Sequence, residues 1–276
     1  MKKKKLADQK SVSVIPAEAG IQNFIMRLLS VSFILAILAA ISLPAGAATL
    51  SGAGTSETLI EQQYLDFLTI GADYQNQQRD ISTASQGKMR LKSQTIDGYI
   101  GVDPYKWLMI FATFGGSAAK VGDAVAYNDS RFKWSAGFDV NWWRYGVTAP
   151  AFMEGDLSLK THAEFAMHNS GAGSEKIDWN EIFAALLVNY EVFVSKKDDL
   201  NKYPYSLALY AGPAVSWLDG DYYANSNISQ KSDFHEEHLV GIVGGAELYA
   251  FSNLSIGGAI QYYDAVTLNA SVRYHF

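Results

Sequence analysis

The chain has 276 residues, of which 49% are hydrophobic, and it contains no cysteine. The absence of cysteine excludes disulfide scaffolds, thiolate metal sites and cysteine nucleophiles. The formal net charge of −6, without a clustered basic stripe, argues against a nucleic-acid partner.

The first 60 residues have the layout of an exported protein. Residues 26–47 contain a basic residue, an apolar run and the ending Ala45-Gly46-Ala47, which is the pattern of a cleaved signal peptide. A transmembrane anchor is the alternative, and the early Pro44 and the small residues around it favour cleavage. Residues 1–25 include SVIPAEAGIQ, which resembles the translation of a dispersed repeat found upstream of bacterial genes, so we expect a mis-annotated extension before a start at Met26. Residues 48–60 are then a short N-terminal segment.

Alternating apolar and polar residues fill most of the chain from 61 to 276. A period of two is the spacing of a strand whose two faces meet different surroundings. The alternating segments are 64–76, 88–101, 107–115, 131–143, 157–168, 178–194, 205–217, 238–250, 254–263 and 266–276. We therefore predict ten strands, with eight as the alternative, because the last hairpin is very tight and residues 195–204 form a long inner turn.

The length of these segments distinguishes between two all-β classes. Strands of a soluble sandwich average about 5–6 residues, whereas a membrane barrel needs about 9–11 residues per strand and an apolar outer face. The segments are about that longer length, and aromatic residues lie near their ends, among them Trp107, Trp134, Trp142, Trp179 and Trp217. We predict an all-β fold, a transmembrane antiparallel up-and-down β-barrel over residues 61–276.

The chain ends with SVRYHF, and Val272, Tyr274 and Phe276 alternate with polar residues. With the signal peptide and the long strands, this ending resembles the small outer-membrane β-barrel proteins of Gram-negative bacteria, a porin-like class, without pointing to one member. The resemblance implies that these three residues form the signal read by the outer-membrane assembly machinery. It also implies periplasmic termini, so residues 48–60 would be periplasmic. The loops near 77–87, 116–130, 169–177 and 218–233, with the short turn near Asp264–Ala265, would be extracellular.

Charged residues are expected on the inward face of the barrel. They are Lys88, Arg90, Lys92, Arg131, Lys133, Asp139, Lys160, His162, Glu164, Glu181, Glu191, Glu247 and Arg273. Buried charges persist only when they are paired or hydrated. A barrel of eight to ten strands is nearly filled by its own side chains, which favours a plugged interior over a narrow pore.

Two short motifs raise the possibility of catalysis. Residues 233–238, DFHEEH, resemble the Asp-x-His half of the omptin proteases, but the Asp-x-Asp at Asp219 and Asp221 lies in the same loop region. His168 and Ser170 resemble the His-x-Ser of lipid A deacylases, which carry that motif much closer to the C-terminus. We interpret both as ordinary loop and rim residues and expect no catalytic residue, cofactor or metal ligand.

The sequence therefore predicts a non-enzymatic protein of the bacterial outer membrane that acts through its extracellular loops in a surface, structural or adhesion role. A narrow pore for small solutes is the alternative, and an outer-membrane hydrolase is the second alternative. The expected partners are outer-membrane lipid, lipopolysaccharide and the assembly machinery, and the ligand of the loops stays open.

Overall fold

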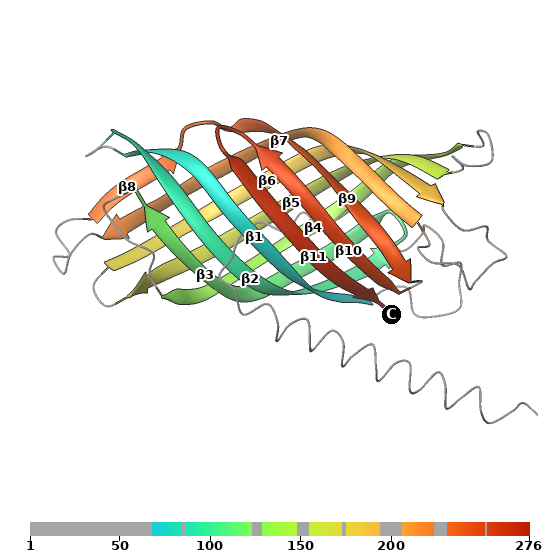
Figure 1. Cartoon of the computed structure of the whole chain (residues 1–276), viewed down its shortest axis with the longest axis horizontal. Helices are drawn as coiled ribbons and strands as arrows, with labels where there is room; N and C mark the ends of the chain where they lie inside the picture. The colour runs from blue at the N-terminus through green and yellow to red at the C-terminus, as the bar shows by residue number, and fades with distance from the viewer. Residues whose placement is uncertain are drawn as a thin grey trace, which may run out of the picture. The chain divides into compact units, whose positions relative to one another are not determined.

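The computed structural model describes residues 68–83, 87–122, 129–147, 155–172, 175–193, 206–223, 231–251 and 253–276 (Figure 1). The expected extension, signal peptide and N-terminal segment, residues 1–60, lie outside the described residues. No described helix has the length and apolar character needed to cross a membrane. The strands are β1 (Leu68–Thr83), β2 (Gly87–Tyr105), β3 (Leu108–Val121), β4 (Ser130–Val147), β5 (Gly155–Ala172), β6 (Glu175–Phe193), β7 (Ser206–Tyr223), β8 (Lys231–Glu236), β9 (Val240–Phe251), β10 (Leu254–Tyr262) and β11 (Val266–His275).

Ten of these strands close into an antiparallel barrel. Strands that are adjacent in the chain pair with each other, except that β9 pairs with β7 instead of β8. The strand β1 closes the ring against β11 through pairs such as Thr69 with His275. Figure 1 shows β1 lying between β2 and β11, with all strands strongly tilted. Within the described part of the chain, the prediction of an all-β, up-and-down barrel of ten strands is confirmed, with β8 as one extra strand.

The extra strand changes the ring at one end of the barrel. We call the end with Leu68 and His275 the terminal end, and the opposite end the far end. β10 and β11 stop at the turn 263–265, and beyond it β8 pairs with β7 on one side and directly with β1 on the other. The backbone N–H of Asp80 donates to Oδ2 of Asp264 at 2.5 Å where this turn meets β1. The described strands thus form a ring of ten at the terminal end and of eight at the far end.

The two faces of the wall differ as the alternation predicts. On β6, Leu186 points outward and is 44% exposed, whereas the adjacent Leu187 points inward and is completely buried. On β11, the outward Val266 and Leu268 alternate with the buried Thr267 and the inward-facing Asn269. Most of the wall is therefore apolar outside and polar inside, which is the arrangement of a membrane barrel.

At the far end the pattern of apolar and polar residues on the two faces inverts. The strands continue through this region and are therefore longer than predicted. There the buried side is apolar and the outer side is charged, as Ile81 beside Asp80 on β1 and Phe234 beside Asp233 on β8 show. The sequence prediction sought apolar residues facing outward, so it assigned most of residues 77–87, 116–130, 169–177 and 218–233 to loops. These loop assignments are wrong for the parts that β1–β8 occupy, and β8 itself was missed.

Candidate functional site: a closed lumen

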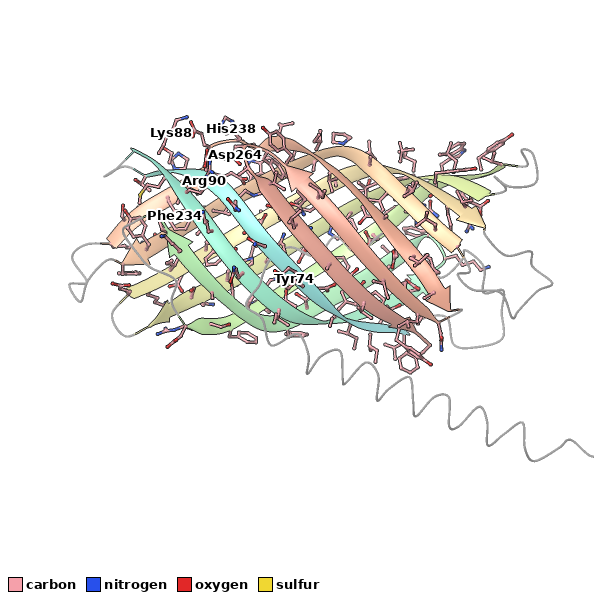
Figure 2. All side chains as sticks on the ribbon, in the orientation of Figure 1. Tyr74, Lys88, Arg90, Phe234, His238 and Asp264 are labelled. Carbon is pink, nitrogen blue, oxygen red and sulfur yellow. The ribbon has the colours of Figure 1, made fainter. Side chains whose placement is uncertain are left out.

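The far end of the lumen is filled by an apolar plug. The plug is a cluster of inward side chains from six strands, each at most 2% exposed: Ile81, Leu91, Ala119, Val121, Ile177, Trp179, Leu218, Tyr222 and Phe234. Figure 2 labels Phe234 near this end of the barrel. Apolar side chains in mutual contact leave no polar path for ions or water. Trp179 was expected at the edge of the lipid-facing band, but it lies inside because β6 carries it on the buried side.

Below the plug lies a charge cluster centred on Arg79. Its Nη2 donates to Oε1 of Glu181 at 3.4 Å, and its Nε lies 3.3 Å from Oε1 of Glu236. The guanidinium also stacks over the ring of Tyr263, 3.8 Å from the ring centroid. Ser216 donates to both glutamates, at 3.3 Å and 2.7 Å. The cluster joins β1, β6, β7 and β8 across the lumen, so it fills the interior rather than lining an opening.

The middle of the lumen carries a second network of buried charges. Lys133 on β4 forms an ion pair with Asp97 on β2. His162 on β5 lies with its Nδ1 2.8 Å from Oδ1 of Asp139, while its Nε2 lies 3.7 Å from Oε2 of Glu164. All of these side chains are at most about 1% exposed. Paired charges of this kind avoid the large cost of an isolated buried ion.

A third layer closes the terminal end. Arg273 on β11 forms an ion pair with Asp73 on β1 and stacks over the ring of Tyr99 at 3.9 Å. Nearby, Ser255 donates to Glu247 at 2.6 Å, and Ser206 donates to Glu191 at the same distance. Because Arg273 and Asp73 belong to the two strands that close the ring, this ion pair crosses the barrel's closing seam.

The structure places most of the predicted lumen charges inside. Buried on the inner face are Lys133, Asp139, Lys160, Glu164, Glu181 and Glu247. Arg131 departs from this expectation because it is exposed, beside a bulge between Ser130 and Lys133, and its Nε donates to the carbonyl of Gly171 at 2.7 Å. On β2, Lys88, Arg90 and Lys92 also face outward, because the inverted pattern at the far end puts Leu91 inside.

Sequence reasoning missed four charges that the networks depend on, namely Asp73, Arg79, Asp97 and Glu236. Arg79 lay in a stretch assigned to a loop, and Glu236 lay in the short motif considered for catalysis. On β1, all odd-numbered residues from Thr69 to Thr83 except Gly71 are buried. The sequence signal is therefore the odd position of Asp73 and Arg79 in this strand. Following parity rather than hydrophobicity would have found Asp73 and Arg79.

The terminal residues of β11 alternate as the predicted assembly signal requires. Tyr274 and Phe276 contact each other edge to face with ring centroids 4.8 Å apart. The backbone N–H of Phe276 donates to the carbonyl of Leu68 at 2.9 Å, which extends the closing seam to the last residue. Val272 pairs with Ala72 across this seam. Recognition by an assembly machine stays a prediction.

The two candidate catalytic motifs are placed differently. Ser170 and His168 are at most 1% exposed and face the lumen at the level of the plug, opposite Ile177 and Trp179 on β6. Ser170 accepts from the N–H of Ala119 at 2.7 Å, and His168 stacks on Trp179 with neither ring nitrogen hydrogen-bonded. In this structure the Ser170 hydroxyl is buried and hydrogen-bonded to the backbone.

In the second motif, Asp233 and His235 face outward, whereas Phe234 and Glu236 of the same segment face the lumen. His235 is exposed and lies opposite Asp219 across β7 and β8, with Asp221 opposite Asp233. The Asp-x-Asp and Asp-x-His segments are thus neighbours on the outer surface, not partners across a lumen. Within the described ranges, no group of three histidine, aspartate or glutamate residues is arranged to hold a metal ion.

No family model matches the chain, and no curated protein matches it significantly. Among solved structures, the chain is similar to the transport unit of the autotransporter AIDA-I from Escherichia coli. The two share 12% sequence identity with a TM-score of 0.35, over 79% of this chain and 92% of that one. A likeness at this level carries no information on function.

Proposed function

We propose that this protein is an integral outer-membrane β-barrel with a closed lumen, and that it works without enzymatic activity through the segments at its far end. The observation that carries the proposal is the combination of an apolar exterior with an interior filled from end to end. Side chains occupy the lumen as the apolar plug and three layers of buried charges. A barrel built this way is a membrane anchor and platform rather than a conduit.

The exterior supports a membrane location. Outward apolar side chains such as Ile70, Ile110, Leu186 and Ile260 are between 41% and 54% exposed. A soluble protein rarely exposes so continuous an apolar band. Near the terminal end the band is bordered by aromatic side chains that are each at least half exposed: Tyr105, Trp107, Trp142, Trp143 and Tyr145. Aromatic girdles of this kind mark the two interfaces of a bilayer.

The inverted alternation supports a far end that projects beyond the hydrocarbon layer, and the resemblance to outer-membrane barrels, which implies periplasmic termini, supplies the orientation. The charged outer face of β1, β2, β7 and β8 at the far end belongs in water or in a polar headgroup layer, not in hydrocarbon. The proposed orientation puts the far end outside the cell and the terminal end in the periplasm. Segments 84–86, 123–128, 173–174 and 224–230 would then be the extracellular connections that meet a partner.

The proposal is tested by cell fractionation followed by a heat-modifiability gel. We expect the protein in the outer-membrane fraction, and we expect the unboiled form to migrate faster than the boiled form because the barrel stays folded in detergent. Recovery in the soluble fraction, or identical migration of the two forms, would contradict the proposal.

The pore alternative makes a different prediction, which liposome swelling measures. Liposomes that contain the wild-type barrel should not swell with small sugars, because the apolar plug blocks the lumen. Swelling at a rate above that of empty liposomes would favour the channel instead.

A further inference from the structure

The strand β8 closes the far end of the barrel with little pairing of its own. It pairs with β1 over the last three residues of that strand, Ile81–Thr83, whereas β2 pairs with β1 over its whole length. Figure 1 shows β8 as a short strand at this end. Two of its side chains point into the lumen, Phe234 in the apolar plug and Glu236 below it. The position of β8 against β1 therefore depends on how well the barrel accommodates these two side chains.

The outer face of β8 meets water. Lys231, Asp233 and His235 point outward and are exposed. Side chains of this kind do not belong in hydrocarbon, so β8 lies beyond the apolar band and outside the membrane-spanning part of the barrel. Glu236 on its inner face is 5% exposed. It is thus a buried carboxyl group in the part of the protein that responds to the pH of the medium.

More carboxyl groups than cations surround Glu236. The titratable and charged groups that face it from the elements packed against β8 are Arg79 on β1, Glu181 on β6, and Tyr263 and Asp264 in the turn 263–265, and β7 contributes the hydroxyl of Ser216. If Glu181 and Glu236 were both ionised, the one guanidinium of Arg79 would balance two buried carboxylates. Asp264 would add to the repulsion. A buried charge without a partner is costly, so the cluster favours a proton on one glutamate.

The hydrogen bonds indicate which glutamate holds the proton. Glu181 accepts from Nε2 of Gln77 at 3.0 Å and from Nη2 of Arg79 at 3.4 Å, which stabilises it as an anion. Oε2 of Glu236 accepts from Ser216 at 2.7 Å, but its Oε1 lies 3.3 Å from Nε of Arg79 without a hydrogen bond. Burial raises the pKa of Glu236 to about 7, against the opposing effect of Arg79. The proton of the cluster therefore resides on Glu236.

We infer that β8 is a pH-sensitive latch, seated against β1 while Glu236 is protonated and loosened when Glu236 ionises. In the open latch Glu236 reaches water, where a glutamate has its ordinary pKa of 4.5. Because the closed latch binds the proton more tightly, closure is strongest below about pH 4.5 and weakens as the pH rises to about 7.

The size of the effect follows from the two pKa values. One pKa unit is a factor of about ten in an equilibrium constant, so the open fraction rises on the order of 100-fold across this window. The middle and terminal layers of buried charges contain no residue of β8, and they keep the lumen closed when the latch opens. The inference holds whichever end of the barrel faces outside the cell.

The test is hydrogen exchange of the full-length protein in detergent, measured by mass spectrometry between pH 4.5 and pH 8 and corrected for the intrinsic exchange rate. Exchange reports opening even when the open fraction is small. We expect the protection of residues 231–236 to fall on the order of 100-fold over this range. Peptides from β2 and β3 serve as the internal reference and should show no comparable fall.

Two variants identify the group responsible. Glu236→Gln has the shape of the protonated side chain and should keep the protection of β8 at pH 8 at its pH 4.5 level. Glu181→Gln leaves Arg79 with one carboxylate and should also stay closed at pH 8. The matched control is Asp233→Asn, which removes a carboxylate from the outer face of the same strand, where it is 78% exposed, and should show the same fall as the wild type.

The inference would be overturned if the protection of β8 in the wild type were independent of pH. The same fall in Glu236→Gln as in the wild type would overturn it too, because another group would then be responsible. An equal fall in the β2 and β3 peptides would also overturn it, since the whole barrel and not a latch would be opening.

Discussion

Arg79 is the cation that holds the upper charge cluster together, so replacing it tests whether the lumen is a packed interior. The variant Arg79→Met keeps a similar length but leaves Glu181 and Glu236 without this guanidinium. Removing one partner of a buried ion pair costs about 3–5 kcal/mol, and the lost stacking on Tyr263 adds up to about 2 kcal/mol. We therefore expect Arg79→Met to lower the free energy of unfolding by about 4–6 kcal/mol.

The assay is equilibrium urea unfolding of the barrel in lipid vesicles, followed by tryptophan fluorescence. The control is Arg144→Met, which breaks a partly exposed ion pair with Asp156 and should cost about 1 kcal/mol or less. Changing both glutamates to glutamine in the Arg79→Met background should recover about half of the loss or more, because it removes the uncompensated charge. A loss below about 1 kcal/mol for Arg79→Met, or no recovery with the glutamines, would refute the closed and dry environment of this cluster.

Three further predictions concern the wall and the closing seam. Phe276→Ala should strongly reduce the amount of folded protein in the outer-membrane fraction. In purified, refolded protein it should lower the free energy of unfolding by at most about 1 kcal/mol, since the side chain is 44% exposed. Equal losses in both assays would argue against an assembly signal. Leu186→Arg should lower the free energy of unfolding in urea by about 2–4 kcal/mol, because it puts a charge in the apolar band. Asn180→Arg, near the far end, should lower it by about 1 kcal/mol or less. Equal losses would contradict the position of the apolar band. Because the chain has no cysteine, a single Cys at position 186 should react with a bilayer-soluble thiol reagent and one at 187 should not; the reverse would contradict the assignment of faces.

The sequence was sufficient for the class of fold because few folds other than a membrane barrel need alternation over about ten residues in every strand. It predicted ten strands and the inward placement of Lys133, Asp139, Glu181 and Glu247, which the structure places on the buried face. Parity within one strand sets the face of every residue until a bulge intervenes. A bulge between Ser130 and Lys133 interrupts this parity, and Arg131 beside it is exposed instead of buried.

The apolar plug and β8 could not be found in the same way. The prediction equated apolar with outward, which holds only where the exterior meets lipid. Beyond that level the barrel has the pattern of a small soluble barrel, with Phe234 inside and Asp233 outside. The change of parity between β8 and β9 at residues 237–239, and the direct pairing of β8 with β1, are tertiary features without a local sequence signal.

Conductance in a planar lipid bilayer tests the closed lumen most directly. We expect the purified wild-type barrel, once inserted, to give no stable single-channel steps. We expect Trp179→Ala/Phe234→Ala to stay closed as well, because the three layers of buried charges below the apolar plug still fill the lumen. Stable steps from the wild-type protein would contradict a closed lumen and establish the barrel as a pore.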